Sequence, residues 1–351
     1  MKYIPENTEE LRKLVRDESI NLGDIDTSEI TDMSYLFVDR DSDKYCERRD
    51  FSGINTWDTF NVECTEGMFY NCIYFNEEVN FGNSFIFEAN SMFENCISFD
   101  KDIVFGAVPT CTRNMFKNCK VFNSKIIFNE NGEIEDAESM FEDCANFNQP
   151  IQFDKVSSID NACCMFINCK SFNQNMDLPN LCISDVSGMF EGCESFNSKV
   201  RFDTEYCSSF HSMFKDCISF NQDIYFNTNM AGSFRSMFEN CKNLNSEIIL
   251  DNTESCEDFS NMFKNCISFN QKIRFKSFSA TSFESMFENC INLNQKIYLI
   301  GSECRCTEKM FYGCHKLKSD VILDGISYVD SLGAYENFGH CIFDSESYQE
   351  E

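Results

Sequence analysis

The sequence predicts a repeat solenoid, in which short coils of chain stack and each coil contributes one short parallel β-strand and one short helical turn. The segment Met-Phe-x-x-Cys, with variants of it, recurs eleven times, with steps of 23 to 25 residues between the methionines. A single repeat of this length cannot bury its own apolar face, so such a period is typical of stacked coils. The methionines are Met68, Met92, Met115, Met140, Met165, Met189, Met213, Met237, Met262, Met286 and Met310.

The order of apolar residues within one repeat predicts where its turn and its strand lie. In the repeat that begins at Met213, Cys217 and Phe220 follow at spacings of four and three residues, which favour a helical turn. The residue before each such Cys is Asn, Asp or Gly, which tolerate a left-handed backbone and end helices. Ile224 and Phe226 then alternate with a period of two, as in a strand with one buried face.

Two rows of polar residues indicate that the coils stack in register. The residue two positions after each methionine alternates in charge along most of the array, and alternating neighbours about 5 Å apart attract by ~0.2–1 kcal/mol. Asn follows the second aromatic position in nine of eleven repeats, which predicts a ladder of hydrogen bonds to turn backbone groups. The charged row reads Glu94, Lys117, Glu142, Ile167, Glu191, Lys215, Glu239, Lys264 and Glu288.

Both ends of the chain are expected to cap the array. Asn7, followed three residues later by Glu10, resembles a capping box before a helix over residues 8–18. Residues 1–62 are therefore interpreted as an N-terminal cap with the first imperfect repeats, and residues 63–324 as the eleven-repeat solenoid. Residues 325–351 are predicted to form a degenerate last repeat with an acidic tail. The charged stretch 39–50 has no periodic apolar residue and predicts an inserted surface loop.

The charge of the chain argues against several classes of partner. Its 351 residues carry a formal net charge of −29, which opposes contact with DNA, RNA or anionic lipid. We therefore expect no nucleic-acid partner. No apolar run approaches the ~18 residues of a membrane span, and the first residues lack the apolar core of a secretory signal.

The 22 cysteines suggest a disulfide scaffold by number but not by position. Twelve of them, Cys341 included, occupy one fixed place in the repeat, where Cys acts as a small buried hydrophobe. Disulfide frameworks are typical of short secreted domains. We therefore expect reduced thiols and a cytoplasmic location, with the cell surface, reached without a visible signal peptide, as the alternative.

At this level the chain resembles the BspA-type leucine-rich repeat proteins, which are bacterial repeat proteins often described as surface proteins. The segments Leu22–Phe37 and Asp50–Asp58 look like the amino-terminal part of that family, and the Met-Phe-x-x-Cys-x-x-Phe-Asn-Gln units look like its repeat. The resemblance implies a leucine-rich-repeat-like solenoid that binds proteins or surfaces and carries no catalytic residues. The chain departs from the pattern because the family's Trp-Asp-Thr-Ser-Asn-Val-Thr turn survives only at Trp57–Thr59.

No group of residues in the sequence has the pattern of a catalytic site. The three histidines lie in different coils, and no metal-binding His pair, nucleophile elbow or phosphate loop occurs. One group has the ligand types that zinc accepts, namely Cys304, Cys306, Cys314 and His315. Cys304 and Cys314, however, occupy positions that small buried residues hold in other coils. We therefore expect no enzyme, no cofactor and no metal.

The outward residues of the strands are the candidate binding surface. In leucine-rich repeats such residues line the concave face, where partners bind. The two outward rows hold six acidic and six basic residues, a net charge of zero in a chain of −29. A solvated strand face can also simply be mixed, so both readings stay open. The candidate partner-binding residues are Arg201, Tyr225, Lys272, Arg274, Lys276, Lys296 and Tyr298.

Two functions remain open on this evidence. The favoured one is a non-catalytic module that binds a protein, in particular an acidic one, on its strand face. The alternative is a structural repeat protein that self-associates or forms part of a surface or particle assembly.

Overall fold

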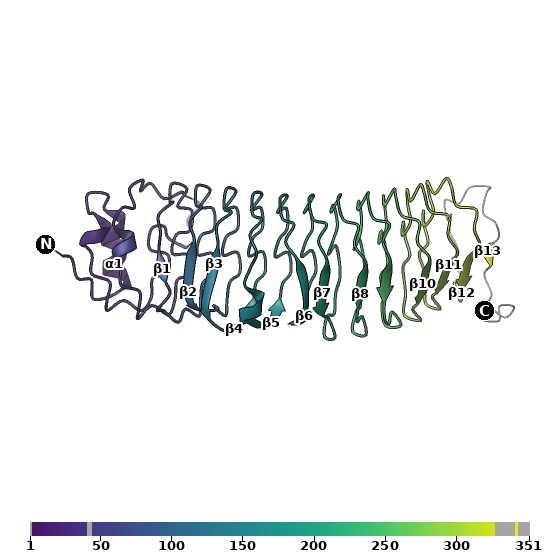
Figure 1. The fold of residues 1–351 in the computed structure, drawn as a ribbon, viewed down its shortest axis with the longest axis horizontal. Coiled ribbons are helices and arrows are strands. Elements are labelled where there is room, and N and C mark those ends of the chain that lie inside the picture. Colours follow the sequence, from purple (N-terminus) through teal and green to yellow (C-terminus); the bar gives the residue numbers. More distant parts are fainter. Residues whose placement is uncertain (1, 41–43, 327–340, 343–351) are drawn as a thin grey trace. The chain divides into compact units, whose positions relative to one another are not determined.

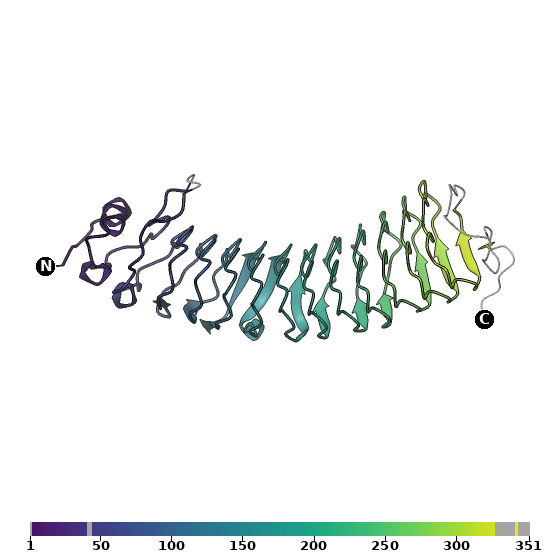
Figure 2. The same cartoon turned by 90° about the horizontal axis from the view of Figure 1, so that it is seen from above.

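The computed structural model describes residues 2–40, 44–326 and 341–342, and it confirms a solenoid of stacked parallel coils. The chain divides into two compact units, Met1–Gln174 and Asn175–Glu351, called here the N-terminal and the C-terminal unit. Within each unit the coils follow one another side by side, and their strands share one face (Figures 1 and 2). The degenerate repeat predicted over 325–351 lies largely outside the described residues.

The N-terminal unit begins with the predicted capping helix, which is somewhat shorter than expected. Helix α1 spans Thr8–Arg16, and the Asn7 side chain accepts a hydrogen bond from the Glu10 amide at 3.0 Å. Strand pairing is parallel in β1-β2-β3 and in β4-β5. The strands are β1 (Asn80–Phe81), β2 (Ile103–Ala107), β3 (Ile126–Glu130), β4 (Gly132–Asp136) and β5 (Val156–Asn161). Three short 3-10 turns are η1 (Leu22–Asp24), η2 (Ile54–Thr56) and η3 (Phe153–Lys155).

The C-terminal unit holds the more regular strands. Pairing is parallel in β6-β7, in β8-β9 and in β10-β11-β12-β13, and partners lie one repeat apart, as Ile273 and Ile297 do. The strands are β6 (Met176–Ile183), β7 (Val200–Asp203), β8 (Ile224–Phe226), β9 (Ile248–Leu250), β10 (Ile273–Lys276), β11 (Ile297–Ile300), β12 (Val321–Asp324) and β13 (Cys341–Ile342).

The segment predicted as a helical turn forms a chain of tight turns and no helix. We call it the turn edge: in each repeat it runs from the residue before the Met to the Phe or Leu seven residues after it, as in 212–220. Ser212 and Asp216 have φ values of 54° and 61°, and the equivalent residues of all eleven repeats are also left-handed. Because of this alternation, the Phe214 amide donates to Met237 O in the next coil, whereas the Cys217 amide donates to Phe214 O within its own coil.

The core consists of rows of aromatic rings that stack from coil to coil. In the C-terminal unit the rings of Phe214, Phe238, Phe263 and Phe287 follow one another at centroid distances of 5.5 Å. The cysteine row is buried as predicted from Cys72 to Cys290 and half-buried at Cys314, and it also forms hydrogen bonds. Cys241 Sγ donates to Phe214 O of the preceding coil at 2.9 Å, and the same contact recurs along both units. Burial raises the pKa of the Cys241 thiol well above its ordinary value.

The two polar rows behave as the sequence predicted. Lys215 Nζ lies 2.8 Å from Glu191 Oε1, and Lys264 Nζ lies 3.1 Å from Glu288 Oε2, so alternating charges do pair between coils. In the Asn row, Asn245 Oδ1 accepts the Asn270 backbone amide at 2.8 Å. A further ladder joins the left-handed asparagines, where Asn265 Nδ2 donates to Asn240 Oδ1 at 2.7 Å.

The described second half of the surface loop predicted over 39–50 is mostly exposed, but Cys46 and Arg48 are buried. Arg48 is only 4 % exposed, and its guanidinium donates to Val15 O at 2.9 Å and Ile20 O at 2.7 Å. The carbonyls at the end of α1 have no partner within the helix. The planar guanidinium has five donors and satisfies Val15 O of this end and Ile20 O beyond it, so Arg48 is buried instead of projecting into water.

Candidate partner-binding surface

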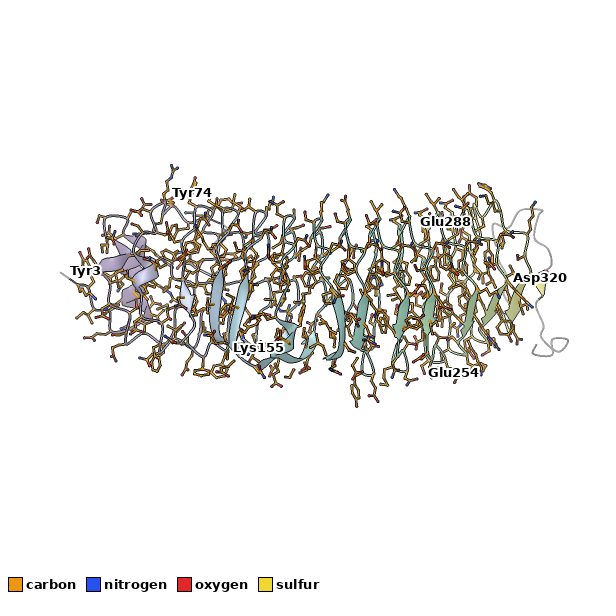
Figure 3. All side chains as sticks on the ribbon, viewed as in Figure 1. Tyr3, Tyr74, Lys155, Glu254, Glu288 and Asp320 are labelled. Carbon is orange, nitrogen blue, oxygen red and sulfur yellow. The ribbon has the colours of Figure 1, made fainter. Side chains whose placement is uncertain are left out.

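The strand face of the C-terminal unit consists of the side chains that point outward from its strands. In β10 the buried Ile273 and Phe275 alternate with the exposed Arg274 and Lys276. This is the period of two expected where one face packs on the core. Figure 3 shows Glu254, in the turn after β9, and Glu288, on the turn edge, at opposite edges of the C-terminal unit. Substitutions on this face therefore leave the stacked core untouched.

Five of the predicted site residues come together on two paired strands. Lys272, which precedes β10, and Lys296, which precedes β11, are exposed. Arg274 and Tyr298 are register partners, and the Arg274 guanidinium carbon lies 5.3 Å from the centroid of the Tyr298 ring. We call Lys272, Arg274, Lys276, Lys296 and Tyr298 the basic cluster.

Lys276 connects the basic cluster to the neighbouring loop. Its Nζ lies 3.2 Å from Glu254 Oε1 and 5.0 Å from the centroid of the Phe278 ring. Both members of this ion pair are about half exposed, so water screens the attraction between them. A partner carboxylate can replace Glu254 at little cost.

The other two predicted residues lie on the strand face but outside the basic cluster. Arg201 on β7 forms an ion pair with Asp177 at 2.7 Å, and Lys199 binds the same carboxylate at 2.8 Å. The hydrogen bonds from Lys199 and Arg201 lower the pKa of Asp177. Tyr225 on β8 donates to Glu247 Oε2 at 3.1 Å, and this bond raises the pKa of its phenol. Both residues therefore belong to local acid–base pairs rather than to one continuous basic patch.

Of the four residues with zinc-like ligand types, Cys304 is buried, Cys306 and Cys314 are half-buried, and His315 is exposed. Cys304 is 5 % exposed, and its Sγ donates to Cys306 O at 3.6 Å. Cys314 Sγ donates to Phe287 O at 2.9 Å, as the other turn-edge cysteines do. Among residues 2–40, 44–326 and 341–342, no group of three or more His, Cys, Asp or Glu is placed to hold a metal ion. In that same part of the chain, every helix is too short or too polar to cross a membrane.

Sequence reasoning missed two features of the N-terminal unit. A cavity of about 390 Å³ lies beside α1 and is lined in part by Arg16, Phe37 and Arg48. Exposed aromatic rings also occur at Phe60 and Phe85, outside the positions that repeat. The exposed rings could have been found from the sequence, because Phe60 and Phe85 do not fall on the core positions of the repeat.

The comparisons with known proteins give a family and no function. The family model described as "Mycoplasma protein of unknown function, DUF285" matches residues 42–105, 107–182, 180–275 and 251–335. No curated protein and no solved structure matches the chain.

Proposed function

We propose that this chain, which belongs to the DUF285 family of Mycoplasma proteins of unknown function, has a non-catalytic role. In this role its strand face binds a partner protein. The basic cluster is the observation that carries this proposal. It consists of four cations and a tyrosine on two paired strands and at the residues just before them, in a chain whose net charge is −29. Arg and Tyr are enriched among the residues that dominate protein interfaces.

The partner that suits this surface is an acidic segment of a protein. Complementary charge steers encounter and fixes orientation more than it adds affinity, so a small basic region on an acidic protein selects both partner and register. The Arg274–Tyr298 pair adds a planar surface that a partner side chain can cover. Tyr225 and Arg201 lie further along the same face and extend the surface.

Two finer assignments accompany this proposal. The chain is a member of the BspA-type leucine-rich repeat group, in which the strand face is the usual binding surface. We place it in a reducing compartment, the cytoplasm, because turn-edge cysteines such as Cys241 and Cys266 use their thiol protons in hydrogen bonds to carbonyls. Alkylation of the denatured, unreduced protein should accordingly modify all 22 thiols.

The test is charge reversal on the strand face. The variant Lys272→Glu/Arg274→Glu and the matched control Lys120→Glu/Lys242→Glu change the net charge equally, and all four positions are exposed. Capture of a partner from the native source, identified by mass spectrometry, should be lost with the first variant and kept with the second. Both melting temperatures should stay close to that of the wild type. Unimpaired capture by the strand-face variant would overturn the proposal.

Self-association is separated from this role by light scattering across protein concentration. The proposed module keeps one molar mass at all concentrations. A mass that grows with concentration, and that the strand-face variant reduces, would indicate the structural alternative, in which the basic cluster joins copies of the chain.

A further inference from the structure

Three exposed phenylalanines gather on two adjacent coils of the N-terminal unit. Phe60, Phe85 and Phe87 are 67 %, 63 % and 57 % exposed, whereas the phenylalanines of the repeated core positions are buried. Ser84 Oγ donates to Thr59 O at 2.6 Å, which places the next residues, Phe85 and Phe60, on neighbouring coils at the same level. Exposed aromatic side chains on neighbouring coils indicate an interaction site.

Phe87 extends the same surface. It is separated from Phe85 by the buried Ile86, so both rings point outward. Its backbone amide donates to Glu63 O of the preceding coil at 2.9 Å. We call Phe60, Phe85 and Phe87 the aromatic patch.

The stretch of sequence that carries the aromatic patch contains acidic residues and no basic ones. Residues 50–100 contain nine Asp and Glu and no Lys, Arg or His. The exposed Asp58 lies beside Phe60, whose amide its Oδ1 accepts at 3.0 Å, and the exposed Glu63 lies beside Phe87. Asn61 Nδ2 donates to Ser28 O at 2.7 Å, which brings the neighbouring coil with Glu29 against the same region. A cationic partner therefore meets both rings and carboxylates here.

Other aromatic rings of the N-terminal unit show the same chemistry within the chain. The guanidinium carbon of Arg40 lies 5.2 Å from the Tyr35 ring centroid, and that of Arg49 lies 4.9 Å from the Tyr74 ring centroid. These are cation–π distances. The stretch that carries the aromatic patch supplies no such cation from its own residues.

We propose that the aromatic patch docks a segment of a partner protein that is rich in Lys or Arg and carries apolar side chains. The partner's cations lie over the rings and pair with the carboxylates of Asp58 and Glu63. The partner's apolar side chains cover the ring edges. This surface is separate from the strand face of the C-terminal unit and takes a partner of the opposite charge. An anionic lipid surface is disfavoured, because the local carboxylates repel it.

The test uses defined peptides and variants that keep the net charge. A fluorescein-labelled peptide of alternating arginine and leucine is titrated with the full-length protein and followed by anisotropy. The variant Phe60→Ser/Phe85→Ser/Phe87→Ser should bind it at least about tenfold more weakly than the wild type. The matched control Tyr206→Ser/Met230→Ser/Phe278→Ser removes three exposed apolar side chains from the C-terminal unit and should bind within about twofold of the wild type.

Three other outcomes would overturn the proposal. Equal binding by the wild type and the patch variant would show attraction to acidic surface alone, and equal binding of a glutamate–leucine peptide would show apolar contact alone. A molar mass that rises with protein concentration in the wild type but not in the patch variant would make a second copy the occupant. If the serine variant fails to fold, Phe60→Leu/Phe85→Leu/Phe87→Leu keeps the apolar surface, and its affinity should still fall because the rings are gone.

Discussion

The turn edge and the strand face of the C-terminal unit are made from the same coils, yet their side chains follow different rules. Along the turn edge the Met, Phe and Cys of one coil recur in the next, and side-chain hydrogen bonds hold the Cys and Asn rows in place. Cys241 and Cys266 donate to Phe carbonyls at 2.9 and 3.0 Å, and Asn265 donates to Asn240 at 2.7 Å. Along the strand face, Tyr225 pairs with Ile249 and Arg274 pairs with Tyr298.

The difference separates the residues that stabilise the fold from the residues that are free to vary for recognition. A buried row of identical residues about 5 Å apart must satisfy every donor, which restricts it to a few residue types. An outward row has water as the alternative partner, so its residues can vary at small cost. Stability should therefore depend on the turn edge and binding on the strand face.

The largest effect is expected for a charge at the turn edge. Cys241 is fully buried, so Cys241→Asp places an unpaired carboxylate among apolar rings and should cost roughly 3–5 kcal/mol of unfolding free energy. Cys241→Ala loses the hydrogen bond to Phe214 O and a small volume, at a cost of about 1–2 kcal/mol. Chemical denaturation of both variants measures these values. Equal costs for Asp and Ala would show that this position is not buried.

A second effect is a loss of stability in alkali. Burial raises the pKa of Cys207 and of Cys256 to about 12, from an ordinary value of 9.0. Above pH 9 the unfolded chain loses these protons while the folded chain keeps them, so stability present below pH 9 is lost progressively toward pH 12. The slope is about 1.4 kcal/mol per pH unit for each thiol.

Two alanine substitutions isolate this alkaline effect. Ala231 and Ala280 hold the same place in other coils and are buried there, so Cys207→Ala/Cys256→Ala is compatible with the fold. This variant should show a shallower decline of unfolding free energy above pH 9 than the wild type does. Identical slopes would contradict burial of the two thiols.

A smaller effect is expected where the turn edge needs a left-handed residue. Asn265 has φ of 60°, donates to Asn240 and accepts from Asn289. Asn265→Ala loses both ladder bonds and strains the backbone, at about 1–2 kcal/mol beyond Asn265→Gly, which relieves the strain. Gly at the equivalent positions 192 and 313 is also left-handed. Thermal unfolding should therefore rank Gly above Ala, the reverse of the order in a helix.

The sequence alone was sufficient for the parts of the fold that repeat. The period, the buried Cys row, the Asn ladder and the Lys215–Glu191 type of pair all follow from residue identity at fixed spacing. The chain of turns was not predictable in the same way. The left-handed residue before each Met is Ser, Asn, Gly, Cys or Lys, and only some of these types signal such a backbone.

The features outside the repeat had no periodic signal to reveal them. Arg48 is charged, and its charge alone predicts an exposed residue. Its burial is explained only by its contacts with Val15 O and Asp17 O at the end of α1. On the candidate site, the residue types identified the outward rows. They did not separate the basic cluster from Arg201, whose partner Asp177 lies one coil away.

Hydroxyl-radical footprinting of the free and the partner-bound protein tests the division between the two edges most directly. Met and Cys oxidise readily when water reaches them, so they report burial, and Tyr225 and Tyr298 report the strand face. The expected result is that the buried turn-edge Met and Cys, such as Cys241, stay unmodified in both states, while Tyr225 and Tyr298 are modified in the free protein and protected in the complex. Oxidation of Cys241 in the free protein, or equal modification of both tyrosines with and without the partner, would contradict this division.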